Sequence, residues 1–85
     1  MRTLQRMNKR ATVEQAFGGV LRELRKRSGK TQEVVALDAG LDRTYISMLE
    51  RATRQPTLET VLVLARALGV TAAEIVAMVE DRYHY

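Results

Sequence analysis

The sequence predicts an all-α protein, a compact bundle of five helices in one domain, and three observations support this. Apolar residues recur at helical spacing through most of the 85 residues, and no alternating run of β-branched residues predicts a strand. Hydroxyl residues stand before the apolar stretches and glycines follow them, as expected of helix caps. The expected connections are two to five residues long, so consecutive helices must pack against one another.

The first expected helix spans residues 12–29. Thr12 and Gln15 have the spacing of a capping box, and the cations at residues 25–27 suit the negative end of the helix dipole. Its apolar stripe comprises Val13, Phe17, Val20, Leu21 and Leu24. Gly18 and Gly19 interrupt this helix at a cost on the order of 1 kcal/mol each relative to alanine. The glycine pair therefore predicts a close approach by a neighbouring helix.

Residues 31–51 predict two short helices joined by a turn. Thr31 is placed to cap the first, and Gly40 can take the left-handed conformation that ends it. Asp42 is placed to cap the second, and Leu41 and Ile46 have the spacing of a hydrophobic staple. The outer face of the second helix then carries Arg43, Thr44, Ser47 and Met48. A helix held at its back, with these groups on its front, has the form of a helix-turn-helix reader of the DNA major groove.

Two more helices complete the expected domain. The fourth is capped by Thr57 and stopped by Gly69, and its expected apolar stripe is Leu58, Val61, Leu62, Ala65 and Leu68. The fifth begins with a capping box of Thr71 and Glu74, and its expected apolar stripe is Ala72, Ile75, Val76 and Val79. We interpret residues 81–85 as polar and aromatic. The expected domain spans residues 12–82, between a basic, flexible arm (residues 1–11) and a C-terminal tail (residues 83–85).

The charge of the chain is uneven along its length. Residues 1–12 carry four cations and no acid, residues 22–54 carry eight cations against five acids, and residues 55–85 carry two against four. Positive potential is thus expected on the first half, beside the helix-turn-helix, as in a nucleic-acid binder. The alternative is an ordinary solvated surface.

Composition excludes or disfavours several other classes. The chain has no cysteine, which excludes disulfides and thiolate metal sites, and we expect no metal and no cofactor. The only histidine, His84, lies one residue from the C-terminus. Gly18-Gly19 falls inside a helical pattern rather than in a phosphate-binding loop. We therefore do not expect the protein to be an enzyme. No apolar run is long enough to span a bilayer and no signal-peptide core is present, so we expect a cytoplasmic protein.

Residues 17–75 carry a family resemblance. F-G-x-V-L-R-x-L-R, then G-K-T-Q-E-V-V-A-L-D-A-G-L-D-R-T-Y-I-S-M-L-E-R, then P-T-L-E-T-V-L-x-L-A-R-A-L-G-V, resemble the Cro and phage-repressor (XRE-type) helix-turn-helix regulators, which have lambda-repressor-like domains. The spacing between Gln32, Gly40, Ile46, Glu50 and Pro56 matches along with the residue types. L-D-R-T-Y-I-S, followed by E-R and R-x-P, is similar to the controller proteins of restriction–modification systems.

The resemblance implies a sequence-specific regulator that binds double-stranded DNA as a homodimer and reads a pseudo-palindromic operator. It implies that Gln32 contacts the DNA backbone and supports the base-reading side chains. It also implies that Arg51 and Arg54 contact phosphates. It also implies an ion pair, Arg25 with Glu50, between the first and third helices. The fifth helix matches the family's dimer contact, and we leave open whether its apolar residues are core or dimer seam; these are Ile75, Val76, Val79 and Tyr83.

Each candidate reader has an alternative role. We favour a base contact for Arg43 over a phosphate contact or a solvated side chain, because arginine can bond guanine bidentately. Thr44 and Ser47 are placed to bond a base, a phosphate or their own helix backbone. Tyr45 can pack its ring with its hydroxyl on phosphate, or pack alone, and Met48 is apolar where the family is often polar, so it either lies against a thymine methyl or contributes nothing.

Three further alternatives stay open at this point. The family often has glycine where this chain has Ala52, so the path of the turn after Glu50 is undetermined. An antitoxin-type regulator would chiefly bind a partner protein through residues 79–85 or the arm, and the partners considered are a toxin or RNA polymerase. An architectural binder would hold DNA without sequence preference.

Overall fold

Five helices, in the order that the sequence predicts, make up most of residues 11–83, which are the residues that the computed structural model describes. They are α2 (Val13–Arg27), α3 (Gln32–Ala39), α4 (Arg43–Glu50), α5 (Leu58–Leu68) and α6 (Ala72–Tyr83). No strand occurs within this part of the chain, and the prediction of an all-α fold is confirmed. The expected arm, apart from Ala11, and His84 lie outside the described residues.

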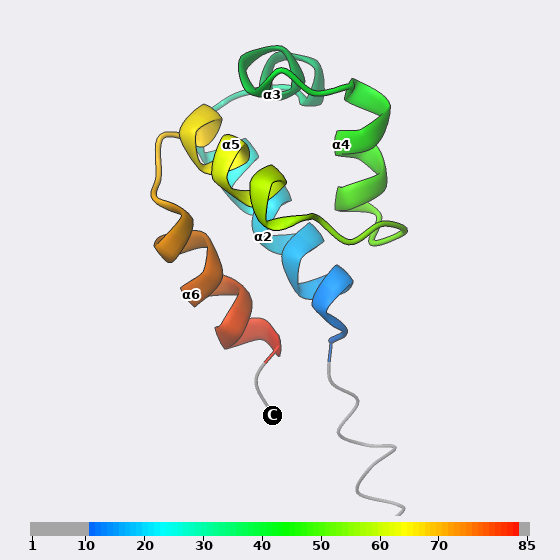
Figure 1. The fold of residues 1–85 in the computed structure, drawn as a ribbon, viewed down its shortest axis with the longest axis vertical. Coiled ribbons are helices and arrows are strands. Elements are labelled where there is room, and N and C mark those ends of the chain that lie inside the picture. Colours follow the sequence, from blue (N-terminus) through cyan, green and yellow to red (C-terminus); the bar gives the residue numbers. More distant parts are fainter. Residues whose placement is uncertain (1–10, 84–85) are drawn as a thin grey trace, which may run out of the picture.

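Helix α2 runs through the middle of the molecule, with α4 on one side and α6 on the other (Figure 1). α3 lies across one end and packs against α4 and α5, and α5 also packs against α6. The core between them consists of Phe17, Val20, Leu21, Leu24, Val35, Ala36, Ile46, Leu49, Val61, Leu64, Ala65, Leu68 and Ile75. All five helices contribute to this one core, so the orientation of α4 depends on the whole bundle.

Gly18 explains how α4 comes so close to α2. A Cβ atom added to Gly18 would lie 2.5 Å from the carbonyl oxygen of Leu49 and 2.9 Å from that of Glu50. Those distances are shorter than van der Waals contact, so any side chain at Gly18 would push the end of α4 away. The close approach predicted from the glycine pair is confirmed.

The predicted helix caps are mostly confirmed. Reciprocal side-chain to backbone hydrogen bonds join Thr12 to Gln15 and Thr71 to Glu74, and Gly40 ends α3 with φ 70°. The prediction for Asp42 is wrong in part. Asp42 occupies the N-cap position of α4, but its side chain accepts no capping hydrogen bond. Helix α4 therefore begins without a side-chain cap, while Ile46 and Leu49 bury its back.

The predicted apolar stripe of α5 is wrong at two positions. Leu58 and Leu62 are 73% and 53% exposed, whereas Leu64, which the prediction left out, is fully buried. The buried stripe is Val61, Leu64, Ala65 and Leu68. Because α5 has apolar residues almost all round, two stripes had helical spacing, and only packing against α3 and α6 selects between them.

Helix α6 extends further than predicted. Residues 81–83, which we interpreted as a polar and aromatic end, form its last turn. Ile75 is 2% exposed and belongs to the core, while Val76 is 50% exposed and Val79 is half-buried. No single helix in the described part of the chain is long and apolar enough to cross a membrane, and α5 and α6, which together have the length, bend by 109°.

Candidate nucleic-acid interface

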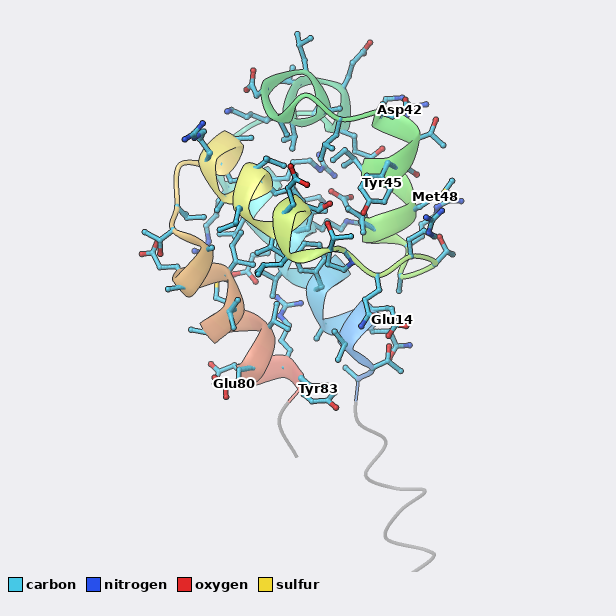
Figure 2. The ribbon with its side chains drawn as sticks, viewed as in Figure 1. Glu14, Asp42, Tyr45, Met48, Glu80 and Tyr83 are labelled. Atoms are coloured by element: carbon cyan, nitrogen blue, oxygen red, sulfur yellow. The ribbon has the colours of Figure 1, made fainter. Side chains whose placement is uncertain are left out.

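The outer face of α4 is the side of this helix that the bundle leaves uncovered. Its back is sealed by Ile46 and Leu49, both fully buried. Arg43 and Thr44 are exposed, and Ser47 and Met48 are half-buried. Figure 2 shows Met48 on the side of α4 that points away from the other helices, and Tyr45 on the side toward α5. The structure thus brings the four predicted outward residues together on one accessible surface.

An ion pair joins α2 to the end of α4. Arg25 Nε donates to Glu50 Oε2 at 2.6 Å and Arg25 Nη2 donates to Glu50 Oε1 at 3.1 Å, which is the bidentate arrangement. The side chains are 14% and 4% exposed, so the pair is largely desolvated. These hydrogen bonds raise the pKa of Arg25 above its ordinary value, against the opposing effect of burial. The ion pair expected from the resemblance is present.

Gln32 extends this pair to the outer face of α4. Its Nε2 donates to Glu50 Oε1 at 3.0 Å, and its Oε1 accepts from Arg43 Nη1 at 3.4 Å. A carboxylate only accepts hydrogen bonds, so Glu50 turns the amide nitrogen of Gln32 inward and leaves the amide oxygen facing Arg43. Three linked contacts therefore run from Arg25 in α2 to Arg43 at the surface.

A hollow of about 410 Å³ opens where α3 begins. It is lined by Arg25, Gly29, Lys30, Thr31, Gln32, Glu33 and Arg43. The N-terminus of a helix carries partial positive charge, and three of the lining side chains are cationic. The ammonium group of Lys30 is held in place, because its Nζ donates to the carboxylate of Asp38 at 2.9 Å and to the carbonyl of Ala67 at 2.7 Å. Arg25 is likewise paired with Glu50, and Glu33 also lines the hollow, so the positive charge that faces it comes chiefly from the N-terminus of α3 and from Arg43.

Tyr45 lies between α4 and α5. Its hydroxyl is 3.4 Å from Thr60 Oγ1, and the guanidinium of Arg54 lies 5.9 Å from the centre of its ring. Thr60 is buried and its hydroxyl also lies 3.0 Å from that of Thr57. In this structure Tyr45 therefore has the packing role, and its predicted phosphate contact stays a prediction. The sequence reasoning missed Thr60, although Thr57-x-x-Thr60 was visible at the start of α5.

The turn after α4 takes the path that a glycine would give it. Ala52 has φ 64°, in the left-handed region, and it is the only non-glycine residue of residues 11–83 with a positive φ. Its N–H donates to the carbonyl of Leu49 at 3.1 Å, and that of Thr53 donates to Met48 at 3.0 Å, which is the Schellman arrangement. The question left open by the missing glycine is thus answered, and Arg51 and Arg54 flank the outer face of α4 as exposed side chains.

Replacing Ala52 by glycine is expected to stabilise the fold. An L-residue in the left-handed region costs roughly 1–2 kcal/mol, and part of that gain is lost to the greater freedom of glycine in the unfolded chain. We expect A52G to raise the free energy of unfolding by about 1 kcal/mol and Tm by about 4–8 °C. Thermal unfolding followed by circular dichroism measures this. As a control, T53G changes the next residue of the loop and is expected to give no such gain.

A second, separate surface lies on the side of the bundle formed by α2, α5 and α6. An apolar groove of about 210 Å³ is lined by Val13, Phe17, Gln55, Pro56, Thr57, Leu58, Val61, Ile75, Val76 and Val79. Ile75 forms part of its floor as a core residue, while Leu58 and Val76 are exposed at its edges. Tyr83 lies at the end of α6 and is 42% exposed (Figure 2). The candidate dimer residues thus lie apart from the outer face of α4.

The fold and this surface define a helix-turn-helix protein, with α3 and α4 as its two helices. Residues 21–75 match the helix-turn-helix family model, and the chain belongs to this family of transcriptional regulators. It is 41% identical over 69 residues to an uncharacterised HTH-type transcriptional regulator, y4dJ, of Sinorhizobium fredii (strain NBRC 101917 / NGR234). That match covers 81% of this chain and 90% of the relative.

Two solved structures of restriction–modification controller proteins share the fold. C.AhdI from Aeromonas hydrophila has 42% sequence identity and a TM-score of 0.71, with 73% of this chain and 94% of that chain covered. C.Esp1396I, solved as a tetramer in complex with its natural 35 base-pair operator, has 28% identity and a TM-score of 0.79, with 88% and 99% covered. The resemblance to XRE-type regulators is confirmed by these comparisons.

Proposed function

We propose that this protein is a homodimer that reads a pseudo-palindromic operator by placing α4 of each subunit in the major groove. The observation that carries the proposal is the set of linked contacts from Arg25 through Glu50 and Gln32 to Arg43. It holds a guanidinium at the start of an exposed helix whose back is buried. Arginine in that position can donate two hydrogen bonds to O6 and N7 of a guanine.

Phosphate contacts supply much of the affinity in this proposal. Gln32 stands at the hollow where α3 begins, and Arg51 and Arg54 stand on the loop at the opposite end of α4. These groups therefore flank the reading helix at both ends, as a phosphate backbone flanks the major groove on both sides. Thr44, Ser47 and Met48 lie between them and are placed to meet base edges or methyl groups.

The apolar groove beside α6 is the proposed dimer contact. Val76 and Val79 line this groove, Val76 is 50% exposed, and Tyr83 at the end of α6 is 42% exposed. Apolar surface of this kind is stabilised when a second copy covers it. A two-fold dimer through α6 places two copies of α4 on one side of DNA, and half-sites about 34 Å apart, or a multiple of that, are expected.

The narrower proposal is that the protein controls a restriction–modification system. Its support is the similarity to C.AhdI and C.Esp1396I, both of which are controller proteins, and the operator bound in the C.Esp1396I structure. Genes for a restriction enzyme and a methyltransferase beside the gene for this chain would support this proposal. Their absence from that neighbourhood would count against it, without touching the proposed reading of an operator.

Selection of bound sites from random double-stranded DNA tests the main proposal. We expect a two-fold symmetric site to be enriched, and sedimentation at concentrations that saturate this site is expected to show a dimer. Enrichment of no sequence would contradict operator reading and support an architectural binder. A monomer at saturating concentrations would contradict the proposed dimer.

Arg54→Ala is expected to weaken binding to all DNA sequences alike. Each lost phosphate contact flattens the plot of log K against log salt concentration by about 0.9, so two copies per dimer give about 1.8. Titrations of operator and random DNA at several salt concentrations measure both quantities. Arg66→Ala is the matched control, because Arg66 is an exposed arginine in the last turn of α5, outside α4 and its following loop. A slope that stays the same in R54A would contradict the phosphate contact.

A further inference from the structure

An ion pair at the end of α6 has no place in the functional site described above. The guanidinium of Arg82, in the last turn of α6, donates to a carboxylate oxygen of Glu23 in α2. To reach Glu23 it passes over Gly19, where an added Cβ atom would overlap the guanidinium. The missing side chain at Gly19 is therefore what allows Arg82 to lie across α2.

Gly18 and Gly19 give the same helix two different neighbours. Gly18 accommodates the carbonyl oxygens of Leu49 and Glu50 at the end of α4, while Gly19 accommodates Arg82 from the end of α6. The two contacts are one residue apart along α2, which lies between α4 and α6 (Figure 1). Helix α2 thus contacts both α4 and α6 at this point, so the angle of α6 on α2 also fixes the position of α6 relative to α4.

Stability alone does not explain this arrangement. The Arg82 and Glu23 side chains are 42% and 34% exposed, and an ion pair that open to water stabilises a fold little. A glycine in the interior of a helix destabilises it by about as much as such a pair stabilises the fold. The glycine and the ion pair together therefore add little net stability, and a role in geometry accounts for them better.

The last turns of α6 are where geometry matters most. Ile75 is the buried residue of this helix, and from Val76 to Tyr83 every side chain is half-buried or exposed. Val76, Val79 and Tyr83 in this segment form the proposed dimer contact. A small rotation of this segment on α2 changes the separation of the two reading helices, and two-fold symmetry applies the change in both subunits.

We propose that Arg82 is a positioning residue for operator recognition, which holds α6 at a set angle on α2 by pairing with Glu23 across Gly19. This inference rests on the proposed homodimeric reading of DNA. The pair sets the spacing of the two reading helices rather than the base preference of either. Specificity for the distance between half-sites is then encoded at the far side of the bundle from the bases.

Affinities for a series of operators with one to three base pairs added to or removed from the centre test the proposal. We expect the unaltered protein to have one optimal spacer. In R82A the ratio of affinities between the optimal spacer and the neighbouring ones is expected to fall by about fivefold, or about 1 kcal/mol at 1.4 kcal/mol per tenfold. Affinity for DNA with a single half-site is expected to stay the same, and R66A, which loses an arginine elsewhere, is expected to keep the ratio.

Gly19→Ala separates positioning from stability. Alanine favours the helix, so G19A is expected to melt at a temperature equal to or above that of the unaltered protein once Arg82 swings aside. Its preference for one spacer is nevertheless expected to fall as in R82A. A purely structural role for the pair predicts no such loss in a variant that is not destabilised.

Three results would overturn the inference. If the unaltered protein has no optimal spacer, both the proposed dimeric reading of DNA and this inference are contradicted. If R82A and G19A keep the same ratio of affinities between the optimal and neighbouring spacers as the unaltered protein, this inference alone is contradicted and the proposed function stands. If R82A lowers the affinity for a single half-site as much as the affinity for the full operator, Arg82 acts on the reading helix rather than on spacing.

Discussion

Glu50→Ala is expected to lower the free energy of unfolding by about 3 kcal/mol, which is about 12–24 °C in Tm for a domain of this size. The side chain of Glu50 is 4% exposed and accepts hydrogen bonds from Arg25 and Gln32. Its removal leaves the Arg25 guanidinium largely buried without its carboxylate. Most of the loss comes from that uncompensated charge rather than from the attraction between the two groups.

The matched control is Glu74→Ala. Glu74 is an exposed carboxylate that accepts one hydrogen bond from the backbone of Thr71 in a capping box. Its loss removes that one hydrogen bond and is expected to cost about 1 kcal/mol. Thermal unfolding of both variants in the same buffer measures the difference, and equal shifts in Tm would contradict the structural role of the Arg25 and Glu50 pair.

The pH dependence of the Arg25 contribution follows from the direction of its pKa shift. Glu50 raises the pKa of Arg25, so the folded state holds its proton more tightly than the unfolded state does. Such a group stabilises the fold fully at pH values below its ordinary pKa, and loses that contribution only as the pH rises through the raised value. Across neutral and moderately alkaline pH the Arg25 contribution is therefore expected to be constant.

Local features of the fold were predictable from the sequence because they depend on neighbouring residues alone. A hydroxyl three residues before a glutamine or glutamate is a capping box wherever a helix follows, and both such pairs formed, Thr12 with Gln15 and Thr71 with Glu74. Gly40 followed for the same reason, because a left-handed residue needs no distant partner. Asp42 stands at the N-cap of α4, but its side chain makes no capping hydrogen bond, so the residue type at this position predicted the place of the helix start and not its cap.

Features that depend on tertiary contacts were harder to predict. Leu62 and Leu64 are equally apolar, and only the position of α5 against α3 and α6 exposes the first and buries the second. The pairing of Arg25 with Glu50, 25 positions apart, came from the family resemblance rather than from spacing. The family resemblance implied that Gln32 supports base-reading side chains, but that it does so by accepting a hydrogen bond from Arg43 is shown only by the structure. The DNA contacts assigned to both stay predictions.

Arg43→Ala is expected to remove sequence preference at one base pair of each half-site. A bidentate contact to guanine discriminates by about 1–3 kcal/mol, which is about 5-fold to 150-fold per half-site. Two half-sites lose it together in a dimer, so the combined effect on operator affinity is the largest expected of any single substitution on the outer face of α4. Affinity for random DNA is expected to fall far less, because Arg51 and Arg54 remain.

A second substitution, Gln32→Ala, distinguishes base reading by Arg43 from its alternative, a phosphate contact. Gln32 holds one Nη of Arg43 at 3.4 Å, and in Gln32→Ala that support is lost while the guanidinium stays. If Arg43 reads a base, Q32A is expected to weaken preference at the same base pair that R43A loses, and by less. If Arg43 only contacts phosphate, both variants lower affinity for every sequence alike. A base-substitution profile that R43A leaves unchanged would therefore contradict the reading role, whatever its effect on total affinity.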